Sequence, residues 1–304
     1  MDDVQRLFYK SKFLIDVVKL TGSSYQALFE RIMIGKFGSD FQTVRTWGRE
    51  GDWKCDGYLQ STKTVFQVYA PNSISQGETL RKIEKDYRGA LSQWGSNMTS
   101  WTFVHNGVHG LPAGVISKIS DMRGQNPTIK FEIWGPDEVL KELLSSNESS
   151  ILDVYGPMPT RGDLNSISYV EIKNIVDKVS IAGPSDFSEL NPVSSEKLYA
   201  NNLSSDVQQL IKTGLTKANV VASYFYYHPN PLLGDQVASA FKTKYYELKS
   251  SGLEPDQIFS GLQDFVYGGS TLEPKFQVAA LAILTYLFER CDIFEDVHGA
   301  TGYP

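Results

Sequence analysis

Glu30, Asp56 and Gln67 are the residues of this chain whose types and placement suit the binding of a divalent cation. Asp56 lies near the start of one predicted strand, Gln67 lies on the next strand, and Glu30 lies on the preceding helix. Two carboxylates and an amide carbonyl form the kind of oxygen shell that Mg²⁺ prefers. A metal held in this way, with a lysine that orients or activates the attacking water, serves a metal-dependent phosphodiesterase. The three residues are therefore the candidate metal ligands and catalytic residues, with Mg²⁺ as the cofactor of a catalytically active chain.

The sequence around Asp56 and Gln67 resembles the restriction-endonuclease-like PD-(D/E)xK family, in its Mrr-type arrangement. That arrangement has a glycine-flanked aspartate followed by Gln-x-Lys on the next strand, and Gln67 lies in the sequence FQVYAP from Phe66 to Pro71. The resemblance implies that Asp56 is the central aspartate and that Glu30 is the acid of the first helix. Tyr69 stands where the lysine is expected, and tyrosine is not a cation at neutral pH. Either the lysine has moved or the catalytic activity has been lost.

The best candidates for a moved lysine lie on the predicted helix ETLRKIEKDYRGAL. Lys82 is the first candidate and Lys85 the second, while Lys54 is a weaker candidate close to Asp56. Arg81, Lys82, Lys85 and Arg88 together are also the best patch for contacts with nucleic-acid phosphates in this half of the chain. A solvated outer face of a helix has the same composition, so this interpretation stays open.

Each candidate residue also has a purely structural interpretation. An aspartate followed by glycine, as at Asp56, is typical of a turn. Glu30 suits the solvated side of an amphipathic helix. A buried Gln67 needs hydrogen-bond partners, but these need not include a metal.

The elements that position these residues are predicted within residues 1–158, where strands alternate with helices. Apolar residues recur at steps of three and four between about Glu78 and Trp94, which predicts a helix with one buried stripe. The capping-box pattern from Ser23 to Gln26 predicts the start of the helix that carries Glu30. We expect an α/β domain with a mixed central sheet and helices on both faces.

The rest of the chain is predicted to be a connector followed by an all-α domain. Residues 159–195 are rich in Pro, Ser, Asn and Asp, with two short extended pieces near Tyr169–Ile172 and Val179–Ala182. Residues 196–304 show four helical patterns, which begin near Ser204, Gly234, Pro255 and Pro274. The last pattern is very apolar, which is typical of a buried helix and suits a partner-binding domain.

The sequence FERCDIFED, from Phe288 to Asp296, resembles the helical C-terminal domains of bacterial three-component defence systems. These systems, the Lamassu-like group, are built around an ABC/SMC-like ATPase. The resemblance implies an anti-phage or anti-plasmid complex in which that ATPase and a third subunit are the partners. The chain lacks the sequence G-x-x-x-x-G-K-[ST], so nucleotide hydrolysis has to come from a partner. DNA and a second copy of the chain are further partners that the sequence leaves open.

Charge and composition favour a folded cytoplasmic protein. The net charge of the 304 residues is −6, with 18 basic and 18 acidic residues in residues 1–158 and 11 basic against 17 acidic in residues 159–304. An acidic chain does not bind nucleic acid by bulk charge, so contact with DNA requires a local basic patch. The two cysteines cannot form a disulfide framework, and neither a secretory signal nor an apolar run of about 20 residues is present.

Two main hypotheses about function follow, and a third is an unrelated α/β sensor with a helical oligomerisation domain. The first is a nuclease-like domain that has lost catalysis, or is active only under some conditions, within a defence complex. The second is an active Mg²⁺-dependent DNA endonuclease with a relocated lysine. The absence of lysine at Tyr69 favours the first, and the retention of Glu30, Asp56 and Gln67 favours the second.

Overall fold

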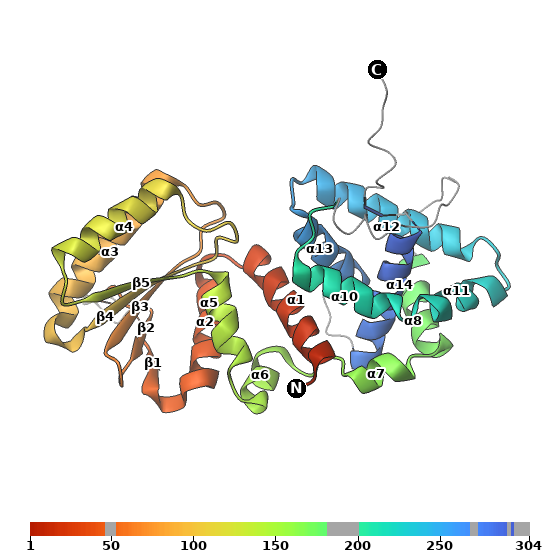
Figure 1. Ribbon diagram of the computed structural model, residues 1–304, viewed down its shortest axis with the longest axis horizontal. Helices are drawn as coiled ribbons and strands as arrows, with labels where there is room; N and C mark the ends of the chain where they lie inside the picture. The colour runs from red at the N-terminus through yellow and green to blue at the C-terminus, as the bar shows by residue number, and fades with distance from the viewer. Residues whose placement is uncertain (46–52, 181–200, 268–272, 291–292, 295–304) are drawn as a thin grey trace, which may run out of the picture. The chain divides into compact units, whose positions relative to one another are not determined.

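The computed structural model describes residues 1–45, 53–180, 201–267, 273–290 and 293–294 and divides the chain into two compact units (Figure 1). The α/β unit comprises residues 16–156, and the helical unit comprises residues 1–15 together with 157–304. The boundary predicted after residue 158 lies close to this division. Residues 1–15 were predicted with the α/β domain, and the structure groups them with the helical unit instead.

The α/β unit contains a mixed five-stranded sheet in the order β1-β2-β3-β4-β5. Strands β1, β2 and β3 pair antiparallel, and β3, β4 and β5 pair parallel. The prediction of a mixed central sheet is therefore confirmed. The strands are β1 (Phe41–Thr43), β2 (Gly57–Leu59), β3 (Thr64–Tyr69), β4 (Ser100–His105) and β5 (Lys130–Trp134).

Helices cover both faces of this sheet (Figure 1), α3 and α4 on one face and α2 and α5 on the other. Helix α6 packs against α2. The helices are α2 (Gly22–Phe37), α3 (Gln76–Trp94), α4 (Ala113–Gln125), α5 (Pro136–Leu144) and α6 (Glu148–Tyr155).

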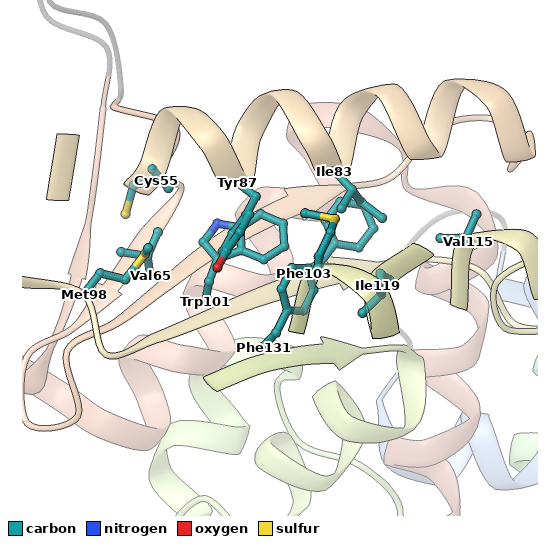
Figure 2. Packing of buried hydrophobic residues seen from close by; sticks show 12 residues of the cluster. Cys55, Val65, Ile83, Tyr87, Met98, Trp101, Phe103, Val115, Ile119 and Phe131 are labelled. Carbon is teal, nitrogen blue, oxygen red and sulfur yellow. The ribbon is translucent and has the colours of Figure 1, made fainter. Parts of the chain in front are cut away.

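A hydrophobic core lies between the sheet and helices α3 and α4 (Figure 2). Ile83 and Tyr87, from the predicted stripe of α3, pack in this cluster with Trp101 and Phe103 of β4. The rings of Tyr87 and Trp101 meet edge to face with centroids 5.3 Å apart. Complete burial of such large side chains is the main source of stability in this unit.

Strand β3 directs alternate side chains to the two faces of the sheet. Val65 belongs to the core under α3, and Tyr69 packs against the same cluster. Gln67 lies between them in the alternation and shares their face. Phe66 faces the other way, where its ring lies 5.6 Å from that of Phe29 on α2.

The start of α2 differs from the predicted capping box at Ser23. The helix begins at Gly22, its N-cap residue is Thr21, and the Thr21 side chain makes no capping hydrogen bond. Instead, the Gly22 N–H donates to the Ala70 carbonyl oxygen at 2.7 Å. A contact with the end of β3 therefore fixes where this helix begins, which a local capping pattern does not reveal.

The helical unit surrounds α14, whose residues from Gln277 to Phe288 are all buried except Tyr286. A helix that is apolar on all sides belongs at the centre of a helical domain. Helices α7, α8, α10, α11 and α13 pack against α14. The helices are α1 (Asp3–Lys19, of which residues 3–15 belong to this unit), α7 (Arg161–Ser166), α8 (Tyr169–Ser180), α10 (Ser205–Leu215), α11 (Ala218–Tyr227), α12 (Leu233–Ser250), α13 (Pro255–Tyr267) and α14 (Pro274–Glu289).

Sequence predictions in this unit differ from the structure at two places. The extended piece predicted near Tyr169–Ile172 is helical, and so are Val179 and Ser180 of the second predicted piece, whose residues 181–182 lie outside the described residues. The β-branched residues of α8 favour strands locally, but their spacing of three and four residues places them on one buried face. The helix predicted to begin near Ser204 is two helices, α10 and α11, which are separated at residues 216–217.

His105, at the end of β4, makes the stability of the α/β unit sensitive to acid. Its side chain is 3% exposed, and its Nδ1 atom accepts a hydrogen bond from the Gly107 N–H at 3.1 Å. Burial lowers the pKa of His105 to about 4, whereas the pKa in the unfolded chain is about 6.5. The unfolded state binds the proton first, so the free energy of unfolding is expected to fall by about 2 kcal/mol from pH 7 to pH 5.

Urea denaturation followed by tryptophan fluorescence measures this loss, because all five tryptophans lie between residues 47 and 134. His105→Gln removes the titrating group and is expected to reduce the pH-dependent loss. His109→Gln, at an exposed position, is the matched control and is expected to leave it unchanged. An unchanged pH dependence in His105→Gln would contradict the assignment to His105.

Candidate functional site

Glu30 and Asp56 line one pocket of about 380 Å³ in the α/β unit. Glu30 comes from the middle of α2, and Asp56 directly precedes β2. Both residues are more than nine-tenths buried. The pocket is lined by Ser23, Gln26, Ala27, Glu30, Val44, Arg45 and Asp56. The structure thus brings together two carboxylates that lie 26 positions apart in the sequence.

Asp56 is bound to β3 by three hydrogen bonds. Its backbone N–H donates to the Phe66 carbonyl oxygen at 2.8 Å. Its Oδ2 atom accepts from the Gln67 side-chain Nε2 and from the Val68 backbone N–H, both at 2.7 Å. Asp56 and Gln67 are therefore in direct contact, as the positions on neighbouring strands predict. The other amide atom, Gln67 Oε1, is buried and has no hydrogen-bond partner among the described residues.

Glu30 is bound by Arg45, which no sequence pattern marks as a site residue. The two terminal nitrogens of Arg45 each contact a different oxygen of Glu30 at 2.5 Å, and Gln26 Nε2 adds a bond of 2.9 Å to Oε1. The hydrogen bonds to Glu30 raise the pKa of the Arg45 guanidinium, and the negative charges of Glu30 and Asp56 raise it further. Arg45 is thus a fixed cation beside both carboxylates.

Tyr69, which stands in place of the expected lysine, is part of the aromatic packing of the sheet. Its ring lies 5.8 Å from that of Phe103 on the neighbouring strand. Tyr69 packs against the hydrophobic core of the unit. An apolar environment of this kind suits an aromatic ring and not a lysine ammonium.

Two of the lysines predicted to take the place of the missing catalytic lysine, Lys82 and Lys54, pair with a different carboxylate, that of Asp86. Lys82 Nζ lies 2.5 Å from Asp86 Oδ2, and Lys54 Nζ lies 3.7 Å from Asp86 Oδ1. Asp86 is on α3 and is only 1% exposed, so it requires such cationic partners. Neither Lys82 nor Lys54 is among the residues that line the pocket of Glu30 and Asp56.

The predicted phosphate-contact patch on α3 is only partly exposed. Arg81, Lys85 and Arg88 are exposed, whereas Lys82 is half-buried against Asp86. Arg81 donates to the Gly77 carbonyl oxygen of its own helix at 3.0 Å. The contact of this patch with nucleic acid stays a prediction.

The pairing of Glu30 with Arg45 bears on the predicted Mg²⁺ site of Glu30, Asp56 and Gln67, which stays a prediction. Among the described residues, no group of three His, Cys, Asp or Glu side chains is placed to hold a metal ion. Asp56 and Gln67 retain the oxygens that suit such an ion, but both oxygens of Glu30 are bound by Arg45. A divalent cation at Glu30 would have to displace a guanidinium that already neutralises the carboxylate.

Comparison with known protein families identifies the C-terminal part of the chain. Residues 170–295 match the family model of C-terminal domain 10 of the ABC-three component (ABC-3C) systems. The matched span contains α8 and the helices from α10 to α14. This finding confirms the C-terminal resemblance at the level of the domain, whereas the restriction-endonuclease-like resemblance of the α/β unit stays a prediction. No curated protein and no solved structure matches the chain. Within the described part of the chain, every helix is too short or too polar to cross a membrane.

Proposed function

We propose that this chain is a subunit of a bacterial ABC-three component defence system. The match of residues 170–295 to a C-terminal domain of such systems is the observation that supports this proposal. The helical unit is then the partner-binding part, and the partners are the ABC/SMC-like ATPase and the third component. Co-expression of the tagged full-length chain with these two components tests the proposal, and failure to recover either of them with the tagged chain contradicts it.

Within this complex, the α/β unit acts without catalysis, as a nuclease-like domain that has lost its metal chemistry. The bidentate pairing of Glu30 with Arg45 is the observation that supports this role. It places a permanent cation where a metal-dependent nuclease needs free carboxylate oxygens. Tyr69 packs against Phe103, so an aromatic ring occupies the position where the restriction-endonuclease-like pattern has a lysine.

One observation favours the alternative, an active Mg²⁺-dependent DNA endonuclease. Gln67 Oε1 is a buried acceptor with no hydrogen-bond partner among the described residues, and it belongs to a side chain bonded to Asp56. A buried acceptor of this kind is uncommon in folded proteins and requires an explanation. Activity of this site would require Arg45 to leave Glu30.

A plasmid-nicking assay separates the two roles. Supercoiled DNA is incubated with the chain and Mg²⁺ or Mn²⁺, alone and with the partner ATPase. Wild type is expected to nick DNA no faster than Asp56→Asn under all these conditions. The active alternative instead requires metal-dependent nicking that Asp56→Asn abolishes and that Lys82→Ala reduces. Lys36→Gln is the matched control, because Lys36 lies on α2 and donates to Ser145 outside the pocket.

A further inference from the structure

The most exposed large hydrophobic side chains of the described residues lie on two neighbouring helices of the helical unit. Tyr226 and Tyr227, in the last turn of α11, are 82% and 74% exposed, and Val170, in the first turn of α8, is 64% exposed. Every other large hydrophobic side chain in the described part of the chain is at most 55% exposed. Helices α8 and α11 pack side by side (Figure 1). Single exposed hydrophobic residues are ordinary, but a group of them marks an interaction site.

Aromatic contacts connect the exposed residues of the two helices. The ring of Tyr169, which is 44% exposed, lies 5.7 Å from the ring of Tyr224 on α11. Tyr224 and Tyr227 are three residues apart and therefore lie on one side of that helix. The rings of Tyr226 and Tyr227 meet edge to face with centroids 5.0 Å apart. We call Tyr169, Val170, Tyr226 and Tyr227 the aromatic patch.

The turn after α11 holds the end of this helix in place. The Asn230 backbone N–H donates to His228 Nδ1 at 3.1 Å, and Asn230 Oδ1 accepts from the Leu232 N–H at 3.0 Å. Pro229 and Pro231 restrict the backbone of the same turn further. Tyr226 and Tyr227 are thus presented from a fixed helix end, which lowers the entropy that a partner loses on binding.

The composition of the patch suits a protein partner. Residues 218–234, which include α11 and the turn after it, contain no Asp, Glu, Lys or Arg. On α8, Lys173 pairs with Asp177 at 2.5 Å, and Glu171 accepts hydrogen bonds from Ser168. The core of a protein interface is depleted in charge and enriched in tyrosine in the same way. Nucleic acid would instead require basic side chains that neutralise phosphates.

The charge of the surrounding chain indicates which protein surface fits. Residues 159–304 contain 11 basic and 17 acidic residues. Two copies of such a surface repel each other, whereas a basic partner is attracted over a distance. Arginine also packs favourably on the face of a tyrosine ring. A net positive surface that carries arginine is therefore the complement of this patch.

We propose that the aromatic patch is the docking surface for the more basic of the two partner subunits of the ABC-three component system. This assignment rests on the function proposed above, since the family match implies that partner subunits exist. Val170, Tyr226 and Tyr227 all lie within the matched residues 170–295. The patch is thus part of the domain that defines membership in such systems.

The test measures the Kd of each purified partner subunit for the immobilised full-length chain by biolayer interferometry. The double variant Tyr226→Ser with Tyr227→Ser is expected to weaken binding of the more basic subunit at least about 30-fold, as loss of tyrosine anchors does at other interfaces. Its melting temperature by circular dichroism is expected to match wild type, because exposed positions contribute little to stability. Higher salt is expected to weaken wild-type binding.

Three further variants make the result specific to the patch. Tyr226→Phe with Tyr227→Phe keeps both rings and is expected to stay within about threefold of wild type, because the rings supply most of the contact area. Val170→Asp places a charge at the other end of the patch and is expected to weaken binding as well. Tyr246→Ser is the matched control, because Tyr246 is 55% exposed on α12 and lies outside the patch.

Four results would overturn the proposal. These are unchanged affinity in the folded serine variant, an equal loss in Tyr246→Ser, a loss confined to the less basic subunit, and a dimer of the isolated chain that the serine substitutions dissociate. The last result would assign the patch to a second copy of the chain. If wild type binds neither subunit, the proposed function fails as well. If wild type and the serine variant bind equally, only the assignment of the surface fails.

Discussion

A fragment that contains only residues 196–304 is expected not to fold cooperatively, although it spans the whole predicted helical domain. The fragment lacks α8, which packs against the central helix α14. Complete burial of an aliphatic side chain contributes about 1.5–3 kcal/mol, so four of them contribute about 6–12 kcal/mol. This is comparable with the whole stability of a typical domain, about 5–15 kcal/mol. The four residues of α8 that are each no more than 2% exposed are Ile172, Ile175, Val176 and Val179.

Urea denaturation followed by far-ultraviolet circular dichroism tests this expectation. The full-length chain is expected to show a cooperative helical transition, and the fragment is expected to show a gradual one. Within the full-length chain, Ile175→Ala is expected to cost about 2–5 kcal/mol. Val170→Ala is the matched control, because Val170 lies on the same helix and is 64% exposed. A sharp native-like transition of the fragment would contradict the role given to α8.

Because the helical unit includes α8 and residues 1–15, the choice of fragment decides whether partner binding can be measured. The family match begins at residue 170 and therefore includes α8. Residues 1–15 also belong to the helical unit, where Lys10 pairs with Asp206 at 2.8 Å and Ser11 donates to Gln263 at 2.9 Å. Binding assays with the subunits of the system therefore need the full-length chain and not a C-terminal fragment.

The sequence predicted the sheet and most helices because their patterns are local. Helix α3 follows from the three- and four-residue spacing of apolar residues such as Ile83 and Tyr87, which pack on the sheet. Helix α8 was missed because its valines and isoleucines favour strands in isolation, and packing against α14 outweighs that preference. The start of α2 was misplaced because a bond from Gly22 to Ala70 sets it.

The candidate site was only partly predictable, because some of its contacts follow from local patterns and others depend on the path of the chain. The contact of Asp56 with Gln67 follows from two neighbouring strands, and the structure shows it directly. The pairing of Arg45 with Glu30 depends on the path of the chain after β1, which no local pattern encodes. The pairing of Lys82 with Asp86 had a visible signal, the spacing of four residues on one helix, but the burial of Asp86 had none.

Asp56→Ala is expected to destabilise the α/β unit by about 2–6 kcal/mol, whether or not the chain is a nuclease. Both the Gln67 side-chain amide and the Val68 backbone N–H donate to the same atom, Asp56 Oδ2. Alanine leaves these two buried donors without that acceptor, and each such loss costs about 1–3 kcal/mol. Urea denaturation followed by tryptophan fluorescence measures the loss in the α/β unit alone, because the tryptophans lie only in residues 47–134.

Asp56→Asn is the matched variant, because a single amide oxygen in the position of Oδ2 can accept both bonds. It is expected to stay within about 1 kcal/mol of wild type while removing the charge that a metal requires. A loss of nicking in Asp56→Ala alone would therefore report unfolding, whereas a loss in folded Asp56→Asn would report the missing carboxylate. A stable Asp56→Ala would contradict the structural role of this side chain. Equal destabilisation in both variants would instead assign that role to the negative charge, which lies beside Arg45.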